Sequence, residues 1–167
     1  REQQAKEFFD AQVAHIEPIL EKEKTGLSVA FFAVASDGTI TVRKPNDYVS
    51  SMIELAGGTY SLNGYVPEEE NALSTLKMQM EDFYAAEKDA DILIYNGTIE
   101  GELTSIAELV QKNSLFADFK AVKSGQVYTT GSNFYQQTSG TCDFIEDLNK
   151  VLTGDTDAEY RFLKKLD

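Results

Sequence analysis

Apolar and polar residues follow one another along the chain in segments that predict helices and strands in turn. Four apolar side chains recur at helical spacing near the start: Phe9, Val13, Ile16 and Leu20. They predict one amphipathic helix from about Glu2 to Lys24, with a kink at Pro18. Residues 28–35 are apolar on both faces, which is typical of a central strand that helices cover on both sides.

The rest of the chain repeats this order of helix and strand. Strands are predicted at three further places: residues 39–42, 92–95 and 127–130. Helices are predicted at five further places: residues 47–56, 80–88, 105–110, 144–152 and 160–166. Residues 60–71, which contain Gly64 and Pro67, predict an exposed loop. This alternation predicts an α/β fold whose central sheet is mostly parallel, with residues 39–42 returning as a hairpin partner of residues 28–35.

Length and charge narrow the possible functions. A chain of 167 residues with 42% hydrophobic content can bury one ordinary core, which predicts one domain. The formal net charge of -13 disfavours binding to nucleic acid or to an acidic membrane surface. No apolar run approaches the roughly 20 residues that a membrane-spanning helix needs. The single Cys142 excludes an intrachain disulfide and a cysteine-based zinc site.

Residue types suited to catalysis or metal binding are scarce and scattered. His15, the only histidine, lies on the predicted first helix away from every strand end, which favours a plain helix residue over a base or metal ligand. Residues 68–70 are consecutive glutamates without the spacing of a calcium loop, which favours a solvated charge run. Cys142 has no histidine to activate it and is expected to fill the core. Because the common catalytic and phosphate-binding motifs are also missing, the sequence predicts no enzyme, no metal site and no cofactor.

Aromatic and amide side chains gather where predicted strands end. Ligands of α/β proteins bind at the carboxyl ends of parallel strands. Aromatic faces stack on planar or apolar ligands, amides orient them by hydrogen bonds, and a guanidinium neutralises an anionic group. The predicted ligand-binding residues are Arg43, Tyr48, Tyr95, Asn96, Phe134, Tyr135 and Gln136. The alternative for Tyr95 and Phe134 is that they close the end of the core.

Three motifs also occur in an order that is found in one protein family. Residues 46–58 end in Ile-Glu-Leu-Ala-Gly-Gly, residues 80–96 join Met-Glu-Asp-Phe-Tyr to Ala-Asp-Ile-Leu-Ile-Tyr-Asn, and residues 119–128 read Phe-Lys-Ala-Val-Lys-Ser-Gly-Gln-Val-Tyr. Together they resemble the substrate-binding proteins of ABC importers for iron siderophores, haem and cobalamin. The resemblance extends from about Leu27 to Leu152.

This resemblance implies a Rossmann-like three-layer α/β/α lobe. Residues 1–25 would be the C-terminal part of the long helix that joins two lobes, and residues 26–167 the C-terminal lobe, without the N-terminal lobe and the lipoprotein leader. Glu81 falls where the family places an acidic residue that docks on the permease. The implied function is capture of a ferric siderophore, haem or similar metal complex outside the cytoplasm, in the periplasm or as a cell-surface lipoprotein, for delivery to an ABC permease.

Two other functions remain open on the residues alone. One is a doubly wound α/β enzyme domain, against which the missing nucleophile and phosphate loop argue. The other is a regulatory or docking module that would use its acidic surface to bind a basic protein.

Overall fold

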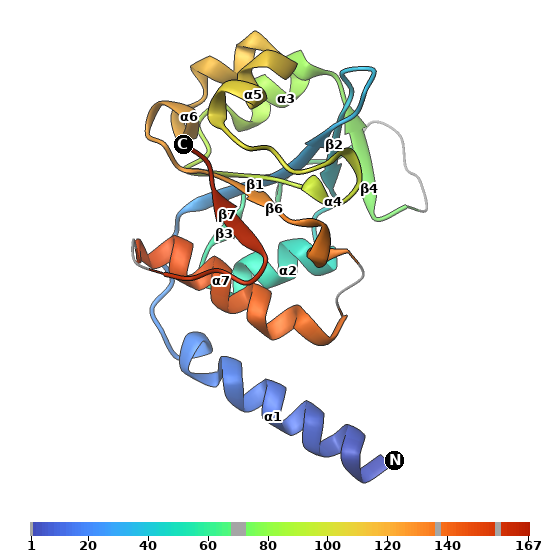
Figure 1. Ribbon diagram of the computed structural model, residues 1–167, viewed down its shortest axis with the longest axis vertical. Helices are drawn as coiled ribbons and strands as arrows, with labels where there is room; N and C mark the ends of the chain where they lie inside the picture. Colours follow the sequence, from blue (N-terminus) through green and yellow to red (C-terminus); the bar gives the residue numbers. More distant parts are fainter. Residues whose placement is uncertain (1, 68–72, 136–137, 156–157) are drawn as a thin grey trace.

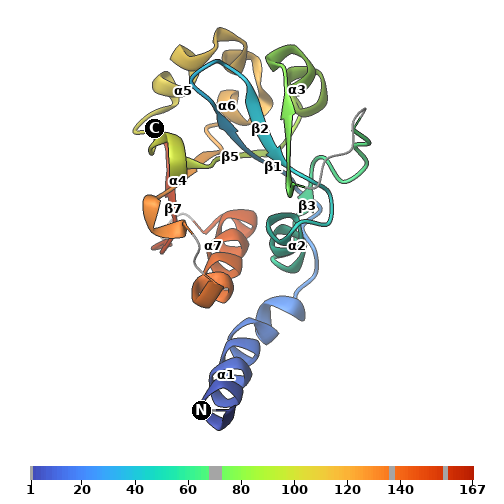
Figure 2. The same ribbon diagram turned by 90° about the vertical axis from the view of Figure 1, so that its right-hand side faces the viewer.

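The computed structural model describes residues 2–67, 73–135, 138–155 and 158–167, which form three layers around a central sheet (Figure 1). One face of the sheet is covered by α2 (Tyr48–Leu55) and α7 (Thr141–Thr153). The other face is covered by α3 (Met80–Glu87), α5 (Ile106–Lys112) and α6 (Lys120–Lys123), as Figure 2 shows from the side. Helix α1 (Glu2–Leu20) lies outside the layer of α2 and α7. The shorter helices are α4 (Gly97–Glu100), η1 (Ser114–Asp118), η2 (Ser132–Phe134) and η3 (Thr138–Gly140).

The described strands form one sheet in the order β4-β2-β1-β5-β6-β7, and β3 pairs with the first residues of β1. Their bounds are β1 (Ser28–Val34), β2 (Ile40–Arg43), β3 (Thr59–Tyr60), β4 (Thr75–Met78), β5 (Ile92–Tyr95), β6 (Val127–Thr130) and β7 (Leu163–Lys165). β1, β5 and β6 are parallel neighbours, whereas β2, β4 and β7 pair antiparallel with the strands beside them. This arrangement confirms the predicted α/β class, the parallel centre and the hairpin of β1 with β2.

The core forms around β1 because its side chains are buried on both faces of the sheet. Phe31 points toward the α7 layer, where its ring contacts Phe134. Phe32 points the other way and packs against Phe83 and Phe116, with ring centroids 4.9 and 5.4 Å apart. Consecutive residues of a strand face opposite sides, so two adjacent phenylalanines supply an aromatic anchor to each layer.

The helices begin and end where the sequence supplies caps. The Asp47 carboxylate accepts a hydrogen bond from the Val49 N–H at the start of α2, and the Ser105 hydroxyl accepts one from Glu108 at the start of α5. Helix α7 ends at Gly154, which has a φ of 72°. Glycine adopts this left-handed conformation without strain, so the predicted stop is where the structure has it.

Two expectations near the sheet edges are wrong. Residues 160–166 do not form a helix, because β7 pairs there with β6 and completes that edge of the sheet. The expected loop over residues 60–71 begins inside β3, where Tyr60 is fully buried; its residues 68–71 lie outside the described part of the chain. Strand β4 was not foreseen either. Short edge strands form because a neighbouring strand offers unpaired N–H and C=O groups, which local sequence does not reveal.

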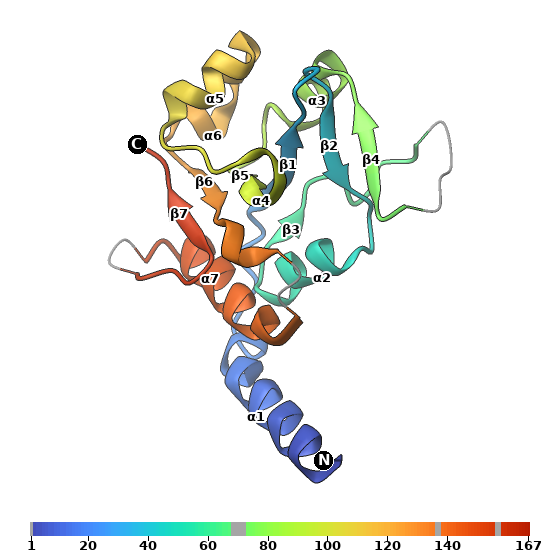
Figure 3. The ribbon, with the colours of Figure 1, turned by 45° about the vertical axis from the view of Figure 1, so that its right-hand side comes forward.

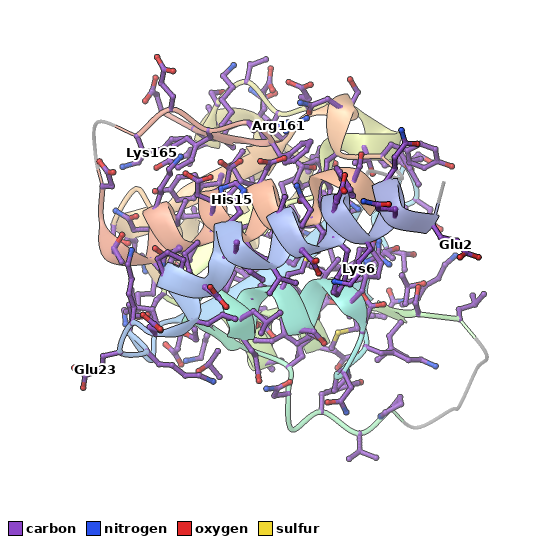
Figure 4. All side chains as sticks on the ribbon, turned by 90° about the horizontal axis from the view of Figure 1, so that it is seen from below. Glu2, Lys6, His15, Glu23, Arg161 and Lys165 are labelled. Carbon is purple, nitrogen blue, oxygen red and sulfur yellow. The ribbon has the colours of Figure 1, made fainter. Side chains whose placement is uncertain are left out.

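Helix α1 is attached to the body through its second half, on the side that faces α7 (Figure 4). Ile19 is its one buried residue among those described. The His15 imidazole lies 2.8 Å from the Glu146 carboxylate of α7, and the Lys22 ammonium donates to the Asn149 side chain at 2.9 Å. The first half carries exposed apolar side chains, Phe8 and Phe9 among them.

The carboxylate of Asp147 ties β7 to α7. It is buried and accepts hydrogen bonds from the backbone N–H groups of Arg161, Phe162 and Leu163, the shortest at 2.7 Å. Burial raises the pKa of Asp147, and these three donors oppose that shift.

We expect Asp147→Ala to lower the free energy of unfolding by about 3 kcal/mol, because three backbone donors lose their acceptor inside the protein. Urea unfolding at pH 7 measures the loss. Asp143→Ala, on the same helix, is the matched control. Its carboxylate pairs with the exposed Arg161 side chain, so we expect a loss below about 1 kcal/mol. Equal losses in the two variants would contradict the role assigned to Asp147.

Candidate functional site

A hollow of about 230 Å³ lies over the ends of β1 and β2, beside α4. Its walls come from β1, β2, Thr75 of β4 and the segment from Asn96 to Glu100. In Figure 3 this part of the sheet, with α4 at its side, comes forward. Ala33 and Ala35 of the β1 end are only half-buried, so the sheet itself forms the floor. The hollow is smaller than the roughly 300–1,000 Å³ of enclosed ligand sites, and it is open on one side.

Among the described residues that line the hollow, Arg43 is the only cation. Its guanidinium donates to the Ser74 and Tyr48 hydroxyls, both at 3.2 Å, and lies 5.0 Å from the centre of the Tyr48 ring. The Asp47 carboxylate lies 3.7 Å away, and the Arg43 side chain is 17% exposed. These contacts fix the guanidinium in place before a ligand arrives, which lowers the entropy cost of binding an anionic group.

Asn96 lines the hollow at the carboxyl end of β5. Its side-chain oxygen accepts hydrogen bonds from the Thr98 N–H and hydroxyl and so caps α4. Gly97 follows, and its N–H donates to the Thr130 hydroxyl. A Cβ at Gly97 would lie 2.5 Å from the Thr130 carbonyl oxygen, so only glycine allows α4 to lie this close to β6.

The structure separates the predicted aromatic residues into two groups. Tyr48 and Tyr135 are each 55% exposed, and Tyr48 contacts Arg43; neither Tyr48 nor Tyr135 lines the hollow. Tyr95 and Phe134 are buried in the core, on opposite faces of the sheet, which favours the alternative that they close the end of the core. Gln136 lies outside the described residues.

Sequence reasoning missed Ile99, which borders the hollow and is 78% exposed. Thr41, Thr75 and Glu100 were missed as well. Ile99 comes directly after the polar residues that follow β5. An isolated apolar residue at this position was the signal that could have indicated an exposed apolar side chain beside the hollow. No such signal marks Thr75, because β4 itself was not foreseen.

Three titratable groups meet between α1 and α7, away from the hollow. One ligand-type atom from each of His15, Asp143 and Glu146 lies within 4.8 Å of the others. His15 therefore has convergent partners from a distant segment, which the sequence did not indicate. Glu146 is also 3.0 Å from the Lys150 ammonium, and Asp143 pairs with Arg161, so we assign the group to an ion-pair network. Cys142 is buried, as expected, and burial raises the pKa of its thiol.

None of the described helices has the length and apolar composition that crossing a bilayer requires.

Comparison with known proteins identifies the family of this chain. A family model described as periplasmic binding protein matches residues 1–134. This chain belongs to the periplasmic binding protein family. The match confirms the family expected from the three sequence motifs. A comparison with curated protein sequences finds no match.

Solved structures share the fold of this periplasmic binding protein chain at low identity. The TroA-like periplasmic binding protein FepB of Veillonella parvula has a TM-score of 0.73 and 13% identity, over 99% of this chain and 57% of that one. An ABC-type Fe3+-hydroxamate transport system protein of Saccharomonospora viridis has a TM-score of 0.71 and 15% identity, over 89% of this chain and 49% of that one. The periplasmic haem-binding protein HutB of Vibrio cholerae has a TM-score of 0.68 and 13% identity, over 93% of this chain and 57% of that one. The chain therefore spans about half the length of these structures.

The two buried tyrosines near the site allow a matched test of their hydroxyl groups. The Tyr95 hydroxyl is buried without a hydrogen-bond partner among the described residues, whereas the Tyr60 hydroxyl donates to the Arg43 carbonyl at 2.6 Å. We expect Tyr95→Phe to leave the free energy of unfolding unchanged or to raise it by up to about 1 kcal/mol, and Tyr60→Phe to lower it by about 1–2 kcal/mol. Chemical unfolding of both variants measures this. A clear loss in Tyr95→Phe would show that its hydroxyl has a partner.

Proposed function

We propose that this chain is the C-terminal lobe of a solute receptor for an ABC importer. Residues 1–25 would contribute to the helix between two lobes, and residues 26–167 would form one wall of the ligand cleft. The supporting observation is that the chain matches about half of each similar structure while its own hollow is small and open. A hollow of this size holds part of a bulky ligand, so a second wall is needed to enclose the rest.

The ligand class that we propose is an iron chelate, such as a ferric siderophore or haem. Two of the similar structures are named for Fe3+-hydroxamate transport and haem binding. The chemistry of the hollow agrees with this class. The apolar floor from β1 and the exposed Ile99 can contact a flat or apolar ligand surface, and Arg43 can bind an anionic oxygen. We propose no catalytic role. The family match favours binding over the alternatives of an enzyme or an acidic docking module.

We further propose that the receptor works outside the cytoplasm, as a periplasmic protein or a cell-surface lipoprotein, and docks on a permease through Glu81. Glu81 is exposed in the first turn of α3. Beside it, an open groove of about 790 Å³ runs between β4 and α3 and includes Asp82. An exposed acidic side chain next to a groove fits an arginine that enters from a partner surface.

Ligand binding by Arg43 is tested by Arg43→Gln, which keeps hydrogen bonding but removes the charge. The probes are a ferric hydroxamate, a ferric catecholate and haem, followed by quenching of tyrosine emission, since the chain has eight tyrosines and no tryptophan. We expect an affinity loss of at least about tenfold, or about 1.4 kcal/mol.

The control for this test is Lys165→Gln, because Lys165 is an exposed cation on β7 outside the hollow. Its affinity should equal that of the wild type. Melting curves establish that both variants are folded. If none of the three complexes binds to a protein that carries both lobes, the proposed ligand class is wrong. If Arg43→Gln binds as tightly as the wild type, the hollow is not the site.

Permease docking is tested by Glu81→Ala in cells that carry the importer. We expect slower uptake of a radiolabelled ferric complex with unchanged ligand affinity, because an exposed charge acts on encounter and orientation. The defect should shrink at high salt. Glu159→Ala, at another exposed acidic position, is the control and should transport normally. Normal uptake by Glu81→Ala would remove Glu81 from the docking surface.

A further inference from the structure

One buried acidic side chain has no role in the proposed site. Glu87 lies in the last turn of α3 and is only 1% exposed. Neither of its carboxylate oxygens has a hydrogen-bond partner among the described residues. An ionised carboxylate in such a place costs several kcal/mol, so proteins either pair it or keep it protonated.

Burial of Glu87 outweighs the two hydroxyl groups that face it and favours the protonated form. From β3 and the residue after it, Tyr60 and Ser61 face the carboxyl group. Both hydroxyl protons are already used, because Tyr60 donates to the Arg43 carbonyl at 2.6 Å and Ser61 donates to the Val29 carbonyl at 2.9 Å. The Ser61 hydroxyl lowers the pKa of Glu87, but burial raises it by more, so the neutral form is favoured.

The charges beyond these hydroxyls do not offset an ionised Glu87. Arg43 and Asp47, from β2 and the start of α2, act on Tyr60 with opposite signs and lie 3.7 Å from each other. On the side of α3, the next residue, Lys88, pairs with Asp89 at the surface. Among the described residues, no cation has a resolved influence on Glu87.

We propose that Glu87 is a proton-dependent latch, which holds α3 against β3 while it is neutral and loosens that contact when it ionises. Because Tyr60 also supports the Arg43 backbone, the loosened contact would weaken the support for the end of β2 at the hollow. This inference concerns the fold alone and does not depend on the identity of the ligand. Burial raises the pKa of Glu87 to about 7 and supports the same conclusion.

The sign of the pH dependence follows from this raised pKa. Between the ordinary value of 4.5 and about 7 the folded chain holds a proton that the unfolded chain has lost. The contribution of Glu87 to stability is therefore complete below pH 4.5, decreases as the pH rises toward 7, and stays low above that. Over this range the unfolding constant should rise on the order of 100-fold on account of Glu87.

The test compares wild type with Glu87→Gln, which imitates the neutral carboxyl group and cannot ionise. Unfolding constants are measured by urea titration at pH 5 and pH 8. We expect similar stability at pH 5 and a variant that unfolds on the order of 100-fold less readily at pH 8. Glu81→Gln, at an exposed position of the same helix, should follow the wild type at both values. A constant difference between wild type and Glu87→Gln across this range would overturn the proposal.

Hydrogen exchange at pH 8 locates the effect. Peptides that cover residues 59–65 and 80–88 should exchange faster in the wild type than in Glu87→Gln, whereas peptides from α7 should not differ. Equal exchange in the first two peptides would overturn the local latch. If Glu87→Gln fails to fold, carboxyl carbon NMR of the wild type decides instead: a buried carboxyl group with a midpoint near 7 supports the proposal, and one near 4.5 overturns it.

Discussion

The double-sided burial of β1 is the constraint on which the rest of this structure depends. A strand that is apolar on both faces is stable only when both faces are covered, so α7 and α2 must lie on one side and α3 with η1 on the other. Phe31 and Phe32 carry this requirement into each layer, through contacts to Phe134 on one side and to Phe83 and Phe116 on the other. The order of helices and strands along the chain then permits a parallel neighbour, β5, and a hairpin partner, β2.

The candidate site arises where this cover ends. At the end of β1, Ala33 and Ala35 are small and half-exposed, and α4 reaches the sheet only because Gly97 allows close approach to β6. The hollow between the end of β1 and α4 therefore results from the packing of these elements, and Arg43 adds a polar group to its wall. In a chain with a net charge of -13, this fixed guanidinium on an apolar floor is the group that we propose for an anionic part of the ligand.

The local sequence predicted the helices and strands that are determined by nearby residues, and it missed those whose formation depends on segments distant in the sequence. The helices around Asp47 and Ser105 and the strands of the parallel centre were predictable from caps and from apolar runs. The strand nature of residues 163–165 was not, because it is decided by β6 and by the Asp147 carboxylate. The same distinction applies to the residues with candidate chemistry. The positions of Arg43 and Asn96 beside the hollow could be expected from their place at strand ends. The burial of Tyr95 and the contact of His15 with Glu146 could not, because they depend on which faces pack together.

Two buried carboxylates in this chain show how neighbouring donors decide the charge of an acidic group. Asp147 and Glu87 are both almost completely shielded from water, and burial raises the pKa of each. Asp147 accepts hydrogen bonds from three backbone N–H groups, so its negative charge is stabilised and holds β7 in place. Glu87 meets two hydroxyls that donate to backbone carbonyls, and its burial outweighs the Ser61 hydroxyl, so its neutral form is favoured. The same residue chemistry therefore gives a permanent tie at one edge of the sheet and a pH-dependent contact at the other, and the difference lies in the direction of the surrounding hydrogen bonds.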